Sequence, residues 1–244
     1  MLSIMIKRAL SRGNDELRQI ELIPNYYPYA PGSCFVKFGK THVICAATIE
    51  ERVPLFLKNT KTGWINSEYG MLPCSCQDRT ERESVKGKQS GRSVEIQRLI
   101  GRALRSIVDL SLLGERQIKV DCDVIQADGG TRTASITGAF VAVYLACQKL
   151  LKHGKILENP IVDHLVAISC GILRNTPLLD LDYSEDSNAE VDSNFVMSSD
   201  RIIEIQSCGE RRPFSEEEFM QLLKYAQKAK CELIEKQKLA LGIQ

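Results

Sequence analysis

The chain has 244 residues, of which 43% are hydrophobic and 26% are charged, the composition of an ordinary globular protein. Its formal net charge of +1 at pH 7 excludes binding to nucleic acid through bulk positive charge, so any such site has to arise from local clustering. No apolar run in the sequence approaches the roughly 18 residues that a membrane-spanning helix needs, which argues against a membrane partner. Nine scattered cysteines favour reduced thiols in a cytoplasmic protein over a disulfide framework.

The N-terminal part is predicted to be rich in strands. Residues 14–23 lead into a strand, residues 33–38 and 42–49 form a hairpin about Gly39, and residues 64–72 form another extended piece. The hairpin is predicted because a glycine between two β-rich runs favours a tight turn.

A strongly polar segment follows at residues 74–91. Arginines and lysines are mixed with acidic residues in it, and Arg79 and Arg82 are its first two cations. One interpretation is a solvated, partly flexible loop. The alternative is an arm that contacts RNA, for which unpaired arginines are suited.

A helix is predicted over residues 93–108, where apolar side chains recur at positions i, i+3, i+4 and i+7. Ser93 is the predicted N-cap of this helix. Arg92 would then lie just before the helix, where its side chain can reach an anion from outside the helix body.

The next strand and helix meet at a turn with the character of a phosphate site. Residues 117–125 alternate between apolar and polar side chains, which predicts a strand with one buried face. Residues 134–151 are apolar almost all round and carry a stripe of small residues, which predicts a buried helix. Between them, Gly130, Thr131 and Arg132 combine a flexible turn, free N–H groups at a helix start and a planar guanidinium, all of which suit phosphate oxygens.

An acidic cluster follows the strand that is predicted over residues 162–173. Four carboxylates fall within seven residues and would repel one another unless they are solvated or neutralised by a cation: Asp180, Asp182, Glu185 and Asp186. Oxygen ligands at this density suit Mg²⁺ or Mn²⁺, and the alternative interpretation is an acidic turn. The leucines before Asp180 place it at the end of an apolar strand, which favours a fixed site with the ion between Asp180 and Asp186.

The last elements are a hairpin and a long helix. Residues 189–197 and 201–206 are predicted to pair as strands. Ser215 is the predicted N-cap of the final helix, and Glu218 completes a capping box. Strands, a polar loop and a helix follow one another twice along the chain, which predicts an α+β domain with sheets and helices in layers.

Together these parts predict phosphoryl transfer. Arg92 and the turn at residues 130–132 would hold an anion, while Asp180 and Asp186 with a divalent ion would stabilise charge on a scissile phosphate. If the anion is inorganic phosphate, it is itself the nucleophile and needs no strong protein base. A kinase-like enzyme is a weaker alternative, because the sequence has no P-loop motif.

Several stretches of the sequence closely resemble the ribonuclease PH family. They include DCDVIQADGGTRTASITG at residues 121–138 and DLDYSEDS at residues 180–187, together with residues 63–64, 68–73, 87–92 and 95–102. The resemblance runs from about Arg8 to the last helix. It implies a single domain over residues 1–244 with β-α-β-α layers of the ribosomal protein S5 domain 2-like type.

The resemblance also implies an activity, that of a phosphate-dependent 3′→5′ exoribonuclease. Such a tRNA nucleotidyltransferase trims the 3′ ends of tRNA precursors and other RNAs, uses inorganic phosphate as co-substrate with Mg²⁺ (or Mn²⁺), and releases nucleoside diphosphates. The family forms a homo-hexamer, a trimer of dimers. By position, the resemblance assigns phosphate binding to Arg92, Gly130, Thr131 and Arg132, catalysis and metal binding to Asp180 and Asp186, and RNA contact to Arg79 and Arg82.

Two departures from the family pattern fall in the polar segment. Cys74 stands where an arginine is usual, and Glu81 replaces another basic residue. They bear on RNA affinity and leave the chemistry intact. A catalytically silent RNA-binding ring subunit is the alternative function, and the joint presence of Arg92, Arg132 and the two aspartates argues against it.

Overall fold

The computed structural model describes residues 8 and 11–243, which form two sheets with helices packed on them. The five-stranded sheet has the order β1-β2-β3-β5-β4, with β1 (Ile20–Pro24), β2 (Gly32–Phe38), β3 (Thr41–Glu50), β4 (Trp64–Met71) and β5 (Gln117–Gln126). The four-stranded sheet has the order β7-β6-β8-β9, with β6 (Val166–Leu173), β7 (Thr176–Leu179), β8 (Val191–Met197) and β9 (Ile202–Cys208). The helices are η2 (Leu55–Leu57), α1 (Glu83–Lys86), α2 (Gly91–Ser106), α3 (Leu110–Leu113), α4 (Thr131–Lys152), α5 (Tyr183–Asp186) and α6 (Glu216–Leu241).

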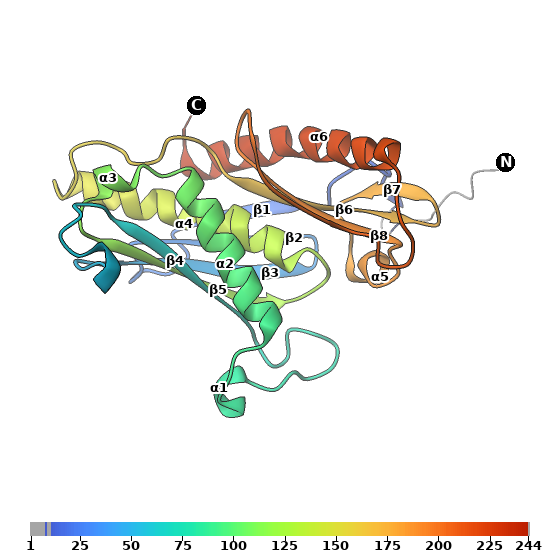
Figure 1. Ribbon diagram of the computed structural model, residues 1–244, viewed down its shortest axis with the longest axis horizontal. Coiled ribbons are helices and arrows are strands. Elements are labelled where there is room, and N and C mark those ends of the chain that lie inside the picture. The colour runs from blue at the N-terminus through green and yellow to red at the C-terminus, as the bar shows by residue number, and fades with distance from the viewer. Residues whose placement is uncertain (1–7, 9–10, 244) are drawn as a thin grey trace.

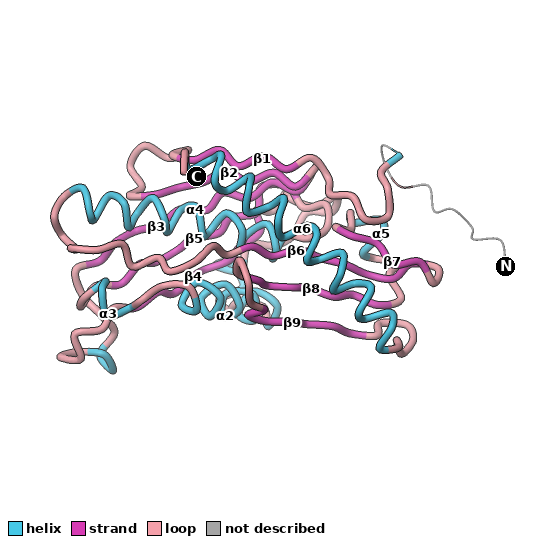
Figure 2. Tube along the Cα trace, turned by 90° about the horizontal axis from the view of Figure 1, so that it is seen from above, coloured by secondary structure: helices cyan, strands magenta, loops and turns pink. Residues whose placement is uncertain are grey.

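The elements stack as sheet, helices, sheet and helix (Figure 1). Helix α2 packs on β4, and α4 packs on β2 and β3, so these two helices cover one face of the five-stranded sheet. Helix α4 also contacts β6, while α6 lies over β6 and β7 on the outer side of the second sheet (Figures 1 and 2). This order confirms the predicted α+β fold with β-α-β-α layers.

The stripe of small residues on α4 brings this helix unusually close to the first sheet. A Cβ atom added to Gly138 of α4 would lie 2.0 Å from Val36 Cγ2 on β2, and one added to Gly32 would lie 2.0 Å from the Ala142 carbonyl oxygen. By length and composition α4 is apolar enough to cross a membrane, but 72% of its apolar window is buried inside the protein. Helix α4 is thus the predicted buried helix at the centre of the fold.

The start of α2 differs from the sequence prediction. Ser90, not Ser93, is the N-cap, and its side chain accepts a hydrogen bond from the Ser93 N–H at 3.0 Å. The two serines lie three residues apart, which is the spacing of a cap and its N–H donor, so the sequence pattern fitted either. As a result Arg92 lies inside the first turn of α2 and not before it.

Two other predicted boundaries have different outcomes. The strand predicted from residue 162 begins only at Val166, because residues 161 and 162 bond instead to the segment after α2: Ile161 bridges Val108, and the Val162 N–H donates to the Ile107 carbonyl at 2.9 Å. The capping box of α6 is confirmed, since the Ser215 and Glu218 side chains each accept a hydrogen bond from the other residue's N–H.

Candidate active site

The turn between β5 and α4 folds tightly against the chain that leads into α5. Gly129 and Gly130 have φ angles of +75° and +66°, the left-handed region that favours glycine. A Cβ atom on Gly129 would lie 2.5 Å from the Leu181 carbonyl oxygen. Glycine is therefore needed here both for the backbone conformation and for the close approach of the two segments.

Helix α4 begins directly after this turn, and neighbouring elements hold its first residues. Gly130 is the N-cap and Thr131 the first helical residue; the first N–H groups of a helix have no acceptor within it and carry the positive end of its dipole. The buried Thr131 hydroxyl shares a 2.8 Å hydrogen bond with the Tyr69 hydroxyl of β4. Arg132 donates to Gln206 Oε1 of β9 at 2.9 Å. The residues of this turn that are predicted to bind phosphate thus form a corner in which β4 and β9 hold the side chains of Thr131 and Arg132.

The first turn of α2 brings Arg92 to the same corner. Its side chain is exposed, and its positive charge, like that of Arg132, acts on both the Tyr69 hydroxyl and the Asp186 carboxylate. The structure therefore brings the four residues predicted to bind phosphate together at two helix N-termini. Their role as phosphate ligands stays a prediction.

Two carboxylates lie near these arginines, Asp186 near both and Asp192 near Arg132. Asp186 ends α5, and burial raises its pKa although Arg92 and Arg132 act in the opposite direction. Asp192 of β8 is a residue that the sequence reasoning missed. Burial, together with the negative charge of Asp186, raises the pKa of Asp192 to about 6. Two partly buried carboxylates that repel each other in this way form a natural binding place for a cation.

Asp180 lies behind this surface, in the interior. Its side chain is fully buried, and it holds a left-handed backbone conformation with φ +54°. Arg18 grips both carboxylate oxygens, with Nη2 2.7 Å from Oδ1 and Nε 3.0 Å from Oδ2. The Arg18 backbone N–H also donates to Oδ2 at 2.8 Å, and Arg12 Nη1 lies 3.5 Å from the same oxygen. The prediction that Asp180 binds the metal stays a prediction, and its observed partners are arginines.

The other two members of the acidic cluster have structural partners. Asp182 caps α5, with Oδ1 accepting from the Glu185 N–H at 3.0 Å. The Glu185 carboxylate accepts hydrogen bonds from Arg8 Nε at 2.7 Å and from Arg12 Nη2 at 3.2 Å. Burial acts to raise the pKa of Glu185, but the two arginines hold this pKa below its usual value. The cluster is thus divided: arginines near the N-terminus neutralise one part, and Asp186 is left to face the site.

The donor set at Asp186 and Asp192 fits a hard divalent cation. Carboxylate oxygens are the ligands that Mg²⁺ and Mn²⁺ prefer, and burial raises the pKa of both aspartates, so a cation beside the pair would stabilise its charged form. Among the residues described, no group of three or more His, Cys, Asp or Glu side chains is arranged to hold a metal ion. An ion at this pair would therefore keep positions for water and for phosphate oxygens.

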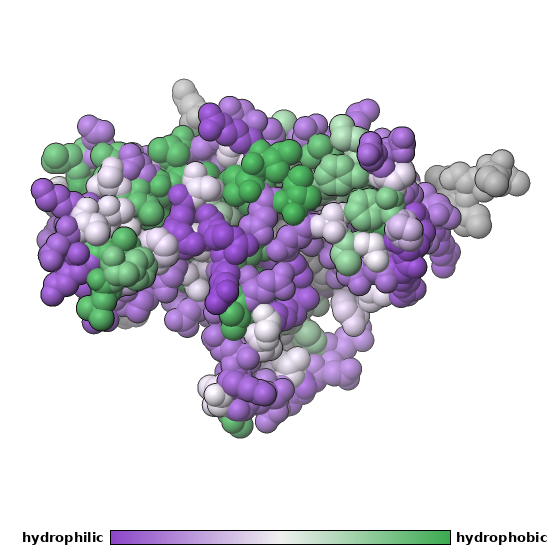
Figure 3. Space-filling view, viewed as in Figure 1, coloured by the Kyte–Doolittle hydropathy of each residue, from purple (hydrophilic) through white to green (hydrophobic). Residues whose placement is uncertain are grey.

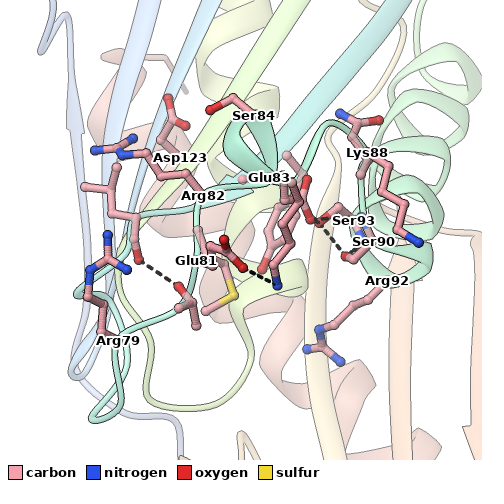
Figure 4. A pocket seen from close by; sticks show the side chains of 17 residues that line it. Arg79, Glu81, Arg82, Glu83, Ser84, Lys88, Ser90, Arg92, Ser93 and Asp123 are labelled. Carbon is pink, nitrogen blue, oxygen red and sulfur yellow. Dashed lines mark hydrogen bonds and ion pairs between the residues drawn. The ribbon is translucent and has the colours of Figure 1, made fainter.

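The polar segment after β4 borders an adjoining cavity of about 800 Å³. Arg79 and Arg82 line one side of it, and Lys88 and Arg92 line the other (Figure 4). Glu83 ties the segment to the start of α2, accepting from Ser93 Oγ at 2.6 Å and from the Ser90 N–H at 3.1 Å. The lobe that carries α1 projects from the body and is largely hydrophilic (Figures 1 and 3). A polyanion that enters here would meet arginines on the way to Arg92.

Comparison with known proteins gives the family. Residues 16–147 match the model of the 3′ exoribonuclease family, domain 1, and residues 163–229 match that of domain 2. Proteins named Ribonuclease PH from two strains of Cereibacter sphaeroides, ATCC 17029 and ATCC 17025, are 55% and 54% identical over 236 residues, which is 96% of this chain and 100% of each relative.

The chain belongs to the 3′ exoribonuclease family.

Solved structures of more distant proteins share the fold. Rice Rrp46 is 20% identical with a TM-score of 0.77, over 95% of this chain and 98% of that one. The Archaeoglobus fulgidus exosome with RNA bound to the active site is 24% identical with a TM-score of 0.79, over 94% and 92% of the two chains. Together with the family match, these likenesses confirm the S5 domain 2-like fold that the family resemblance implied.

Some residues of this family member's site were not predicted from its sequence. Asp192 and Gln206 lie in ordinary strands, and their approach to Asp186 and Arg132 arises only when β8 and β9 pack beside the turn. Tyr69 lies in the stretch 68–73 that resembles the family, but its partner Thr131 lies 62 residues away. Alternation along β8 places Asp192 on the opposite face from the buried Val191 and Ser193, which is the one pattern that could have singled it out.

Proposed function

We infer that this chain is a phosphate-dependent 3′→5′ exoribonuclease, a tRNA nucleotidyltransferase that trims the 3′ ends of tRNA precursors. The observation that carries this function is the meeting of two helix N-termini, two arginines and two carboxylates in one corner, in a chain 55% identical to Ribonuclease PH. Phosphorolysis needs a bound phosphate, a place for the last phosphodiester and charge stabilisation between them. The corner offers all three.

Inorganic phosphate binds at the start of α4. The N–H groups after Gly130 and the Thr131 side chain face the anion, and the guanidinium groups of Arg132 and Arg92 bind its oxygens. Gln206 keeps the Arg132 fork in place. Because both helices direct their positive ends at the same volume, the anion is oriented as well as held.

A phosphate oxygen then attacks the phosphorus of the 3′-terminal phosphodiester. The bond from that phosphorus to the 3′-oxygen of the preceding nucleotide breaks, and the oxygen takes up the proton that the attacking phosphate releases. The products are a nucleoside diphosphate and an RNA one nucleotide shorter. The protein contributes position and electrostatics, since the phosphate is already a nucleophile near neutral pH.

Asp186 and Asp192 would hold Mg²⁺ or Mn²⁺, whereas Asp180, the other aspartate predicted to bind the metal, has both carboxylate oxygens bonded to Arg18. A bound divalent ion supplies positive charge against the oxygens of the scissile phosphodiester. The raised pKa values of the Asp186–Asp192 pair support this assignment.

The RNA strand approaches through the cavity beside the polar segment. Arg79 and Arg82 bind its backbone phosphates. Glu81, which replaces a basic residue of the family pattern, has Oε2 3.5 Å from Lys86 Nζ. Its charge is therefore paired within the polar segment, and Arg79 and Arg82 remain available to bind RNA.

The decisive experiment is product analysis on a tRNA with a 3′ extension, with and without inorganic phosphate. Shortening only with phosphate and a divalent ion, with nucleoside diphosphates as products, supports the function. Equal trimming to monophosphates in phosphate-free buffer would show hydrolysis instead.

The alternative function, a silent RNA-binding ring subunit, is separated from the first by substitution. Asp186→Ala should abolish turnover while the variant still binds RNA and assembles as the wild type does. Wild-type turnover in this variant would remove Asp186 from the site, and no turnover in the unmodified chain would favour the silent subunit.

We further propose that the chain is a single domain over residues 1–244 and a cytoplasmic homo-hexamer, a trimer of dimers. Contacts of α4 with both sheets support one domain, and nine unpaired cysteines support a reducing compartment. Exposed apolar side chains support burial in an assembly; Tyr29 and Leu157 are each 96% exposed and Leu55 is 90% exposed. Light scattering should give six times the mass of the chain.

A further inference from the structure

Arg18 connects two parts of the site that are far apart in the sequence. Its guanidinium donates to Asp180 Oδ1 and Oδ2, as described above, and at the same time to the Asp128 carbonyl at 2.5 Å and the Gly129 carbonyl at 3.4 Å. The Arg18 side chain is 8% exposed. One buried cation thus joins the end of β7 to the turn that opens α4.

The guanidinium lies directly behind the turn. A Cβ atom on Gly130 would meet Arg18 Nη2 at 3.2 Å, so the group packs against the inner side of the turn. The turn's carbonyl oxygens point inward to Arg18, and the N–H groups at the helix start are left for an anion.

Thr41, at the start of β3, holds the same turn through a second pair of hydrogen bonds. Its hydroxyl donates to the Gly129 carbonyl at 2.6 Å and accepts from the Asp128 N–H at 3.0 Å. Thr41 is fully buried. Four hydrogen bonds from two side chains therefore fix three consecutive peptide groups, between Ala127 and Gly130, in a turn whose glycines are otherwise its most flexible residues.

We propose that Arg18 and Thr41 are positioning residues that set the affinity for phosphate by fixing the turn at residues 128–130. Neither residue touches phosphate or RNA. Asp180 orients Arg18, because its two oxygens accept from Nη2 and Nε and so fix the plane of the guanidinium. This inference rests on the proposed function, because it assigns the phosphate to this turn.

The experiment compares Arg18→Lys and Thr41→Val with the wild type. Lysine keeps the positive charge beside Asp180 but lacks the several N–H donors with which the guanidinium also reaches the carbonyls of the turn. Valine keeps the shape of threonine without its hydroxyl. Loss of a residue that orients a metal ligand costs about 10–100-fold in affinity or activity, and we expect an effect of the same order for residues that orient a phosphate-binding turn. Each variant should raise the phosphate KM about tenfold or more, leave the RNA KM within about twofold and recover kcat at saturating phosphate.

Arg116→Lys is the matched control. Arg116 also binds a carboxylate and a carbonyl, with Nε 2.7 Å from Glu51 Oε2 and Nη1 3.0 Å from the Leu113 carbonyl, but none of these contacts involves the turn. It should leave the phosphate KM unchanged. A rise of both KM values in parallel with a loss of thermal stability, or an unchanged phosphate KM in Thr41→Val, overturns the proposal, and Thr41→Val decides it if Arg18→Lys does not fold.

Binding of inorganic phosphate without RNA separates this proposal from the proposed function. Isothermal titration of wild type and variants with phosphate requires no turnover. One outcome is that the wild type binds phosphate, that the variants bind it at least tenfold more weakly, and that neither wild type nor variants degrade RNA. In that case the proposed exoribonuclease function fails and the positioning role of Arg18 and Thr41 stands. If wild type and variants bind phosphate equally and the wild type degrades RNA, the function stands and the positioning fails.

Discussion

Replacing Asp192 by asparagine should raise stability and lower activity at the same time. The substitution keeps the shape of the side chain and removes its charge. The pKa of Asp192 is about 6, against an ordinary value of 3.8, because burial and Asp186 both disfavour the carboxylate. One pKa unit corresponds to about 1.4 kcal/mol, so the charged form costs the folded chain at most roughly 3 kcal/mol.

The sign of this effect depends on pH. The folded chain binds the proton more tightly than the unfolded chain, so the cost is absent below about pH 4 and complete above about pH 6. In EDTA at pH 7.5, Asp192→Asn should raise the free energy of unfolding by about 1–3 kcal/mol. Each kcal/mol should raise Tm by about 2–4 °C. At pH 4 the gain should vanish. Loss of one carboxylate from the pair should lower apparent affinity for Mg²⁺ by about 10–100-fold.

Thermal unfolding at the two pH values and a Mg²⁺ titration of phosphorolysis measure these effects. Asp200→Asn is the control, since the Asp200 side chain is 74% exposed and lies 3.8 Å from Arg201; it should change neither quantity. The reasoning is refuted if Asp192→Asn is destabilised at pH 7.5, or if its Mg²⁺ dependence equals that of the wild type.

Three further substitutions test the rest of the site. Arg92→Ala removes a charge-assisted contact of roughly 1.5–3 kcal/mol, so steady-state kinetics should show a phosphate KM more than tenfold higher and a nearly unchanged RNA KM. Arg79→Ala should give the reverse pattern, with an RNA KM that rises and depends less on salt; identical patterns would contradict both assignments. In urea unfolding, Gly129→Ala should lower the free energy of unfolding by about 2–5 kcal/mol. The alanine Cβ would lie 2.5 Å from the Leu181 carbonyl oxygen, and its backbone would have to adopt φ +75°. Gly154→Ala, with φ +65° and open space, should lose only about 1–2 kcal/mol, and equal losses would show that the contact does not matter.

The division of the acidic cluster explains how one short segment serves both fold and chemistry. Arg8 and Arg12 bind Glu185, and Arg18 binds Asp180, so the charges nearest the core are neutralised by the chain itself. Asp186 is not drawn into these pairs and remains beside Asp192. The arginines thereby reduce the repulsion within the cluster that suggested a cation from the sequence, and Asp186 repels instead a carboxylate outside the cluster, that of Asp192.

Local patterns determined most of the fold. The apolar spacing of α2, the alternation of β5, the small-residue stripe of α4 and the capping box of α6 each depend on residues within a few positions of one another, and each was confirmed. The same holds for the glycine turn before Thr131. Sequence motifs also singled out the arginines and Asp186 that meet in the corner.

Only the tertiary structure decided which charges are free. Arg18 lies 162 residues from Asp180, and Arg8 lies 177 residues from Glu185, so no local pattern could show that these acids were already paired. The sequence treats Asp180 and Asp186 alike and passes over Asp192. Burial and long-range ion pairs separate them, because the energy of a charge depends on the medium and the partners that folding places around it.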